Sequence, residues 1–248
     1  MSESFSNLTA DAIYAKKITQ VEDFRFDDAV ASVFTDMVNR SIPAYADLVK
    51  YIGLLAQRYV EPDSRVYDLG CSLGAVSLSV DQSVQDKKFE IIAVDNSQAM
   101  LNRLTEVTKD YQWQHPFKTV VADIRDIDLQ SNSFTVLNFV LQFLEPADRI
   151  TMLQKIHASL NAGGALILSE KIKFDDPTDD ALVFDLHHDF KRSQGYSELE
   201  IAQKRNALEE VMRLDTDSVQ IQRLKDLGFQ KVIKWFQAFN FVSYLAIK

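Results

Sequence analysis

A glycine-rich turn after the first short apolar run is the clearest candidate for ligand chemistry in this chain. Residues 68–74 have the sequence DLGCSLG and lead into a predicted helix. Glycines let a backbone turn tightly and approach a ligand that a Cβ would exclude. The spacing Asp-x-Gly-x-Ser-x-Gly differs from the Gly-x-Gly-x-x-Gly fingerprint of dinucleotide-binding folds. The turn therefore predicts a ligand loop at Gly70, Cys71 and Ser72, or a nucleotide-fold turn without a ligand.

Acidic and amide side chains follow the next apolar runs. The second run ends in Asp95 and Asn96. A carboxylate at such a strand end accepts hydrogen bonds from both hydroxyls of a ribose; the alternative is that Asp95 only caps the following helix. The glycine turn and Asp95, together with the run LNAGGALIL at 160–168, resemble the S-adenosylmethionine methyltransferases, with serine in place of their usual middle glycine.

This resemblance covers the chain from about Arg65 to its end and extends the candidate site. Asp123 follows the third apolar run, where its carboxylate would bind the adenine amino group and the Ile124 amide the ring. The alternative for Asp123 is a turn residue. Asn138, in the fourth run, is also predicted to contact the ligand. The expected cofactor or substrate is S-adenosyl-L-methionine.

One cation stands out in the second half of the chain. Arg205 lies in a predicted helix, four residues after Ile201 and three before Leu208, on an apolar face that Met212 continues. Burying an unpaired guanidinium is expensive, so we expect Arg205 to meet an anion. The alternatives are a structural ion pair with Asp or Glu, or a side chain that reaches solvent at the helix edge.

Other reactive side chains give weaker signals. Cys71, the single cysteine, lies in the ligand loop and is expected to be structural, and His187 and His188 are expected to be surface or packing residues. No Cys–His or Ser–His–acid order indicates covalent catalysis, and no Cys/His/Asp cluster has metal-ligand spacing, so no metal is predicted.

Short apolar runs alternating with helix-length segments predict the fold that positions these side chains. Five runs before residue 171 indicate a mainly parallel sheet, and the last two indicate an antiparallel hairpin at its edge. The expected class is α/β, a Rossmann-like, seven-stranded sheet of the methyltransferase type. The predicted strands are 66–69, 89–94, 118–121, 134–139, 164–170, 230–236 and 241–247.

The helical segments outside this alternation predict a cap and a lid. Residues 1–64 are expected to form a polar arm (1–22) and a helical cap, whose second helix starts with Pro43 in its first turn and Ser41 as N-cap. Tyr45 in that cap would either cover the ligand or pack in the core. Residues 171–227 are expected to be a helical insertion over the ligand crevice, within a single domain spanning 1–248.

Composition limits the class of function. The net charge is −9, from 36 acidic and 27 basic residues, which disfavours direct nucleic-acid binding. A single cysteine excludes an intrachain disulfide and favours a reducing cytoplasm. We expect no signal peptide, and no apolar stretch approaches the ~20 residues that span a membrane.

Four segments carry a closer resemblance. SIPAY (41–45), DLGCSLG (68–74), VDNS (94–97) and QKR (203–205) look like the carboxy-S-adenosyl-L-methionine synthases, bacterial enzymes with a methyltransferase fold. The resemblance implies conversion of S-adenosyl-L-methionine and prephenate to carboxy-S-adenosyl-L-methionine and phenylpyruvate. It also implies that Arg205 binds the new carboxylate, through the two parallel bonds that a guanidinium makes.

The resemblance further implies a pathway and a mechanism. A separate enzyme would transfer the carboxymethyl group to a wobble uridine of tRNA. Prephenate would release carbon dioxide and hydroxide, the base would deprotonate the sulfonium methyl, and the ylide would capture the carbon dioxide. A homodimer, with Arg205 in its own or a neighbour's site, is expected. Two alternatives stay open: an ordinary small-molecule methyltransferase, and a non-catalytic S-adenosylmethionine-binding protein.

Overall fold

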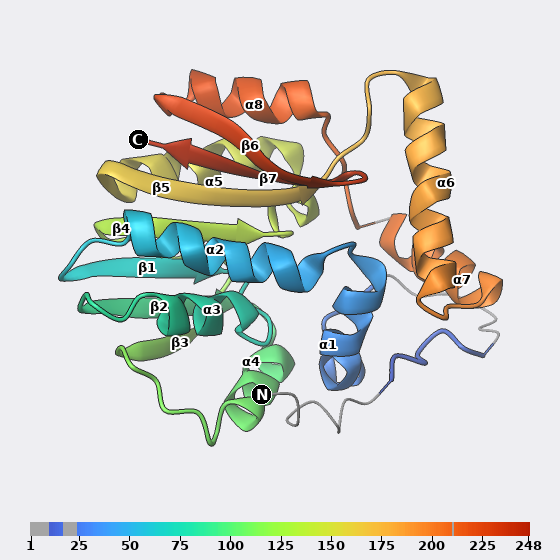
Figure 1. Ribbon diagram of the computed structural model, residues 1–248, viewed down its shortest axis with the longest axis horizontal. Coiled ribbons are helices and arrows are strands. Elements are labelled where there is room, and N and C mark those ends of the chain that lie inside the picture. Colours follow the sequence, from blue (N-terminus) through green and yellow to red (C-terminus); the bar gives the residue numbers. More distant parts are fainter. Residues whose placement is uncertain (1–9, 17–23, 210) are drawn as a thin grey trace.

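A seven-stranded sheet with helices on both faces organises the chain (Figure 1). The computed structural model describes residues 10–16, 24–209 and 211–248. The strand order is β3-β2-β1-β4-β5-β7-β6, in which β1 to β5 are parallel and β7 runs antiparallel between β5 and β6. The strands are β1 (Ser64–Leu69), β2 (Phe89–Asp95), β3 (Phe117–Val121), β4 (Asn132–Asn138), β5 (Leu160–Lys171), β6 (Lys231–Ala238) and β7 (Phe241–Ile247).

Both the predicted fold class and the terminal hairpin are confirmed. Successive side chains of a strand point to opposite faces, and β5 follows this rule: Ile167 packs into one core, and Leu166 and Leu168 into the other. The first core includes residues of α2 and α3, and the second includes residues of α5 and α8. The helices are α1 (Asp28–Ser41), α2 (Tyr45–Tyr59), α3 (Ala75–Ser83), α4 (Gln98–Val107), α5 (Pro146–Ser159), α6 (Pro177–Ser193), α7 (Glu198–Glu209) and α8 (Asp217–Asp226), with a 3-10 turn η1 (Leu141–Phe143).

Three helices stand at the end of the sheet where the parallel strands finish. Figure 1 shows α1, α6 and α7 together on that side, away from the two helical layers. Helices α6 and α7 belong to the predicted insertion at 171–227. Helix α8 lies in the same stretch but packs on the sheet, where Leu224 is buried in the core. The part of the insertion that stands beside the strand ends is therefore α6 and α7.

Two expectations for the N-terminal region were wrong in detail. Ser41 does not cap α2: it is the last residue of α1, and α2 begins at Tyr45 after Ala44, whose φ is +57°. The short turn between the two helices contains Pro43. The predicted arm at 1–22 lies outside the described residues at 1–9 and 17–22. Its described part, 10–16, does not extend as an arm, since Asp11 and Tyr14 are buried.

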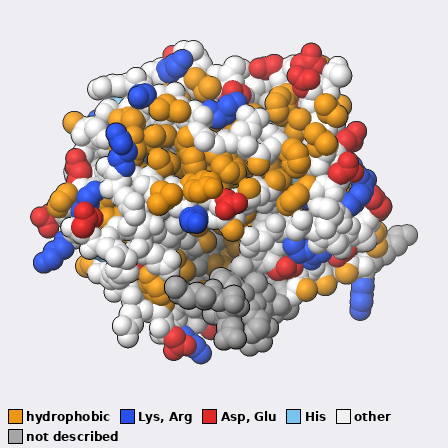
Figure 2. All heavy atoms as spheres, viewed as in Figure 1, with side chains coloured by type: hydrophobic (Ala, Val, Ile, Leu, Met, Phe, Trp, Pro, Cys, Tyr) orange, Lys and Arg blue, Asp and Glu red, His pale blue; other side chains and the backbone are white. Residues whose placement is uncertain are grey.

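The surface on the side viewed in Figure 1 carries many apolar side chains. Figure 2 shows hydrophobic groups gathered over this side of the molecule. Over the described residues as a whole, the exposed large apolar side chains include three on α6 and two on α2. They are Leu182, Phe184, Leu186, Tyr51 and Leu54. Among the described helices, none combines the length and the apolar composition that a membrane span requires.

Candidate functional site

A cavity of about 550 Å³ lies between the ends of the parallel strands and the helices α1, α6 and α7. Its size is typical of a small-molecule site. Every predicted ligand-binding residue except Arg205 lines it. These residues are Tyr45, Gly70, Cys71, Ser72, Asp95, Asn96, Asp123, Ile124 and Asn138. The fold thus brings together positions that are far apart in the sequence.

The glycine turn after β1 forms one wall of the cavity, and Gly70 and Ser72 within it have positive φ angles. Gly70 has φ +77°, and a Cβ there would lie 2.4 Å from Cγ2 of Val140. Its amide donates to the Val94 carbonyl at 2.7 Å, which fixes the turn against β2. Ser72 adopts φ +49°, a left-handed conformation that costs a non-glycine residue about 1 kcal/mol. The backbone therefore approaches the cavity closely at the expected position.

Asp95 connects the end of β2 to this turn. Its Oδ2 accepts from the Ser72 amide and its Oδ1 from the Ser97 amide, both at 2.9 Å. Burial raises the pKa of Asp95, and the two hydrogen bonds partly oppose that effect. The N-cap of α4 is Ser97, whose hydroxyl accepts from Met100. Asp95 is thus not merely a helix cap, and each of its oxygens keeps a lone pair for a ligand hydroxyl.

Two further polar groups make this half of the cavity suited to a polar cation. Asp68 is buried and accepts from the hydroxyl of Ser77 at 2.7 Å and from its amide at 3.1 Å. Burial nevertheless raises the pKa of Asp68 to about 6. Asn138 Oδ1 is buried and has no hydrogen-bond partner among the described residues. A ligand in the cavity would satisfy this acceptor, as buried polar groups require.

Asp123 lines the cavity, and its carboxylate is hydrogen-bonded to Arg125. Arg125 donates to both carboxylate oxygens, from Nε at 3.0 Å and from Nη2 at 2.7 Å. These bonds lower the pKa of Asp123. A ligand amino group would share the carboxylate with Arg125, and the contact with adenine stays a prediction. Ile124 is buried beside it.

The opposite half of the cavity is cationic, but its cations are three lysines that the sequence analysis had not singled out. Lys171 at the end of β5, Lys191 on α6 and Lys204 on α7 all line it. His187 lies among them and donates from Nε2 to the Ser41 carbonyl at 2.8 Å, if that nitrogen carries the proton. Burial, followed by the charges of Lys191 and Lys171, lowers the pKa of His187 to about 2, so its imidazole is neutral at physiological pH.

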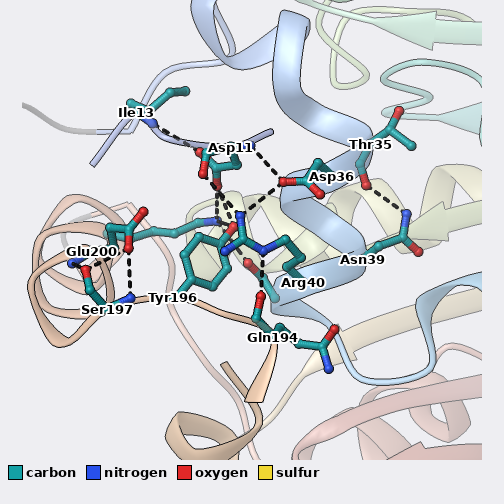
Figure 3. A network of polar contacts seen from close by, with 12 residues as sticks. Asp11, Ile13, Thr35, Asp36, Asn39, Arg40, Gln194, Tyr196, Ser197 and Glu200 are labelled. Carbon is teal, nitrogen blue, oxygen red and sulfur yellow. Dashed lines mark hydrogen bonds and ion pairs between the residues drawn. The ribbon is translucent and has the colours of Figure 1, made fainter. Parts of the chain in front are cut away.

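Lys204 is held by a buried polar network. Its Nζ lies 3.3 Å from Asp11 Oδ2 and 2.9 Å from the hydroxyl of Ser41. Figure 3 shows Asp11 at the centre of this network, facing Tyr196, with Arg40 and Asp36 of α1 beside it. Asp11 thus joins three segments behind the cavity wall: its carboxylate binds Lys204 of α7, and its backbone amide and carbonyl bind Asp36 and Arg40 of α1.

Arg205 occupies a different position from the one that its spacing suggested. Over the described residues, the cavity lining includes Lys204 and Leu208 but not Arg205. Lys204 is three residues after Ile201 and four before Leu208, so it satisfies the same helical spacing as Arg205. Helix α7 ends at Glu209, and Met212 lines the cavity from the turn that follows. The pattern alone did not distinguish the two neighbouring cations.

Metal chemistry has no candidate cluster in the described ranges. No group of three or more His, Cys, Asp or Glu side chains there could hold an ion. Cys71 is buried, and burial raises the pKa of its thiol well above the ordinary value. Cys71 is therefore a lining residue rather than an activated nucleophile.

Known proteins resemble this chain at two levels. Residues 66–164 match the methyltransferase domain family. The carboxy-S-adenosyl-L-methionine synthase of Aliivibrio fischeri strain MJ11 is 52% identical over 238 residues, which cover 96% of this chain and 98% of the relative. The synthase of the same name from Vibrio vulnificus strain YJ016 is 50% identical over 96% of this chain and 97% of its own length.

Solved structures support the fold at greater distance. An O-methyltransferase family protein from Burkholderia thailandensis superposes with a TM-score of 0.60 at 16% identity. The alignment covers 90% of this chain and 60% of that protein. At this identity the likeness establishes a methyltransferase fold and nothing about the reaction.

Proposed function

Because the chain belongs to the family of carboxy-S-adenosyl-L-methionine synthases, we propose that it converts S-adenosyl-L-methionine and prephenate to carboxy-S-adenosyl-L-methionine and phenylpyruvate. One observation carries the proposal: a single cavity has carboxylates at one end and ammonium groups at the other. The first end suits a sulfonium nucleoside and the second an organic dianion. A simple methyl donor site has no need of the second end.

The strand-end half of the cavity would bind the adenosyl group. Asp95 would accept from the ribose hydroxyls, and Gly70 leaves room for the ligand beside the backbone. Asn138 Oδ1 offers an acceptor that the described chain leaves unused. Asp123 and the Ile124 amide would bind adenine.

The reaction balances without a side-chain nucleophile. Prephenate loses its ring carboxylate as carbon dioxide and its ring hydroxyl as hydroxide, which leaves phenylpyruvate. Hydroxide takes a proton from the sulfonium methyl to give water, and the resulting carbanion forms a carbon–carbon bond to carbon dioxide. The protein's role is to hold the reactants together and exclude water. The apolar lining supplied by Phe26, Phe139 and Phe143 supports this role.

Arg205 is our candidate for binding the carboxylate of the product. The residue lies next to Lys204 on α7, and its positive charge lowers the pKa of both His188 and Lys191 on α6. In a homodimer, which the exposed apolar side chains of α6 favour, a neighbouring copy offers a second route to the same ligand. The product would serve a separate enzyme that carboxymethylates a wobble uridine of tRNA.

Ligand analysis tests the proposed function directly. Mass spectrometry of small molecules released from the purified protein should detect carboxy-S-adenosyl-L-methionine. Incubation with S-adenosyl-L-methionine and prephenate should generate equal amounts of this product and phenylpyruvate. Bound S-adenosyl-L-methionine without phenylpyruvate formation would favour a non-catalytic binding protein, and methyl transfer to a third compound would favour an ordinary methyltransferase.

Substitution Arg205→Ala tests the assignment of the carboxylate. Loss of a charge-assisted, two-pronged bond should weaken retention of carboxy-S-adenosyl-L-methionine about 10- to 100-fold, with little change for S-adenosyl-L-methionine. Equilibrium binding of the two ligands measures the ratio. Equal losses for both ligands would contradict the role of Arg205.

A further inference from the structure

Lys191 is a largely buried lysine that has no acid of its own among the described residues. The residue lies on α6, lines the cavity and is only 7% exposed. Throughout the described ranges, its Nζ makes no hydrogen bond or ion pair. Leaving an ammonium buried and unpaired is among the most costly arrangements in a protein interior.

The charged groups around Lys191 disfavour its protonated form further, because all of them are positive. Lys171 approaches from β5, and Lys204 and Arg205 from α7. On α6 itself the titratable neighbours are His187 and His188, whose pKa values are lowered, so both imidazoles are neutral at physiological pH and do not offset the charge of Lys191. Burial first, and then the positive charges of the two other lysines and Arg205, lowers the pKa of Lys191 to about 7.

A comparison with Lys204 argues against a purely structural reason for this arrangement. Lys204 is equally buried, but it has Asp11 at 3.3 Å and the hydroxyl of Ser41 at 2.9 Å. The fold can therefore provide an internal acid at this wall, because Asp11 pairs with Lys204 on α7, the helix next to α6. Lys191 instead presents its charge to the cavity. Strongly perturbed groups that face a cavity are typical of ligand sites.

We propose that Lys191, with Lys171 beside it, binds a carboxylate of the second substrate, a small organic dicarboxylate. The identity of that substrate as prephenate rests on the proposed function. Lys171 Nζ lies 5.9 Å from the centre of the Phe241 ring, which also lines the cavity and offers an apolar surface to a six-membered ring. The sulfonium ligand has its own polar partners at the strand ends, so the cationic half serves the other reactant.

Three variants test this proposal: Lys191→Met, Lys191→Arg and the control Lys173→Met. Methionine keeps most of the length of the side chain and removes the charge, and arginine keeps the charge. Lys173 is exposed, near in sequence to Lys171 and outside the cavity lining. In the methionine variant we expect the KM for prephenate to rise about 10- to 100-fold, while the dissociation constant of S-adenosyl-L-methionine stays within about threefold. Lys191→Arg should recover part of the loss.

A stability measurement separates ligand binding from a structural role. A lysine whose pKa is lowered in the folded state destabilises that state fully below about pH 7, and the effect fades as the pH rises toward its ordinary value of 10.5. Ligand-free Lys191→Met should therefore unfold at a higher temperature than the unsubstituted protein at pH 6.5, with a smaller difference at pH 9. Prephenate should raise the unfolding temperature of the unsubstituted protein more than that of the variant.

The outcomes distinguish this inference from the proposed function. Turnover of prephenate with equal KM values for Lys191→Met and Lys173→Met would overturn the inference and leave the function intact. Equal losses for both substrates, or a ligand-free variant less stable than the unsubstituted protein, would also overturn it. If the unsubstituted protein does not consume prephenate, the proposed function fails. In that case the unfolding temperatures test the anion site by themselves. A larger stabilisation of the unsubstituted protein than of Lys191→Met by prephenate supports the site, and equal stabilisation overturns it.

Discussion

The two halves of the cavity are built by different physics. At the strand ends, the polar side chains are fixed by neighbouring backbone: Asp95 accepts from two amides, and Gly70 turns the chain through a conformation that a side chain would obstruct. On the helical side, lysines from β5, α6 and α7 meet with few backbone constraints. The first half is a local motif, and the second is an arrangement of charges that exists only in the folded chain.

The two halves also contribute differently to the stability of the ligand-free protein. The carboxylates at the strand ends are hydrogen-bonded before any ligand arrives, so they are pre-organised for a cation or a ribose. The lysines repel one another, and Lys191 in particular has no acid beside it in the described part of the chain. The helical half should therefore gain the most from an anionic ligand, and the strand-end half should depend least on it.

Substitution Asp95→Asn should have the largest effect on the strand-end half. An amide cannot accept from Ser72 and Ser97 at the same time, because one end of it carries N–H donors. Loss of the charge also weakens the expected bonds to ribose. We expect the dissociation constant of S-adenosyl-L-methionine to rise about 100-fold, measured by calorimetry. The exposed Asp126→Asn is the control, and equal affinities in the two variants would remove Asp95 from the site.

The strand-end half is also the part that the sequence predicted well. All seven predicted strands are present, and the glycine turn, Asp95 and Asn138 line one cavity as expected. The reason is that parallel strands end at one edge of a sheet, so a residue's place after a strand fixes its place in the site. Ser72 shows the limit: its left-handed conformation follows from the turn, not from its own preference.

The helical half was harder to predict because helical spacing is tolerant. Lys204 and Arg205 both fit between Ile201 and Leu208 at steps of three and four. The contacts of Lys204 with Asp11 and Ser41, two residues far away in the sequence, accompany its place in the wall. Lys191 gave no signal, because a lysine on a helix is ordinarily exposed. Asp11 lies in a stretch that composition assigned to a polar arm. Contacts between such distant segments are not encoded in any local pattern.

Substitution Lys204→Met tests the contrast between the two buried lysines of the helical half, Lys204 and Lys191. It would leave Asp11 buried with its cation removed, although the Tyr196 hydroxyl still donates to that carboxylate. Breaking one side of a buried pair typically costs about 3 kcal/mol, so the free energy of unfolding should fall by about that amount at pH 7. Urea unfolding measures it, and the double variant Asp11→Asn with Lys204→Met should recover part of the loss.

The change in stability of Lys204→Met is to be compared with that of Lys191→Met. Burial lowers the pKa of both lysines, to about 8 for Lys204 and about 7 for Lys191. Removal of Lys204, however, would leave the buried carboxylate of Asp11 without its cation, so we expect opposite signs: removal of Lys204 destabilises the free protein, and removal of Lys191 stabilises it. A loss of stability in both variants would show that the two cations have the same structural role. The distinction between the paired and the ligand-facing lysine would then be wrong.

The smallest effect is expected at Ser72, where the strand-end half stores backbone strain. Because φ is +49°, glycine should be tolerated there better than alanine, by about 1 kcal/mol in the free energy of unfolding. At the exposed Asn102 of α4 the order should reverse by a similar amount, since glycine is the poorer helix former. Chemical denaturation of the four variants gives both differences. The same sign at both positions would contradict left-handed strain at Ser72, and with it the view that this half of the site is shaped by backbone conformation.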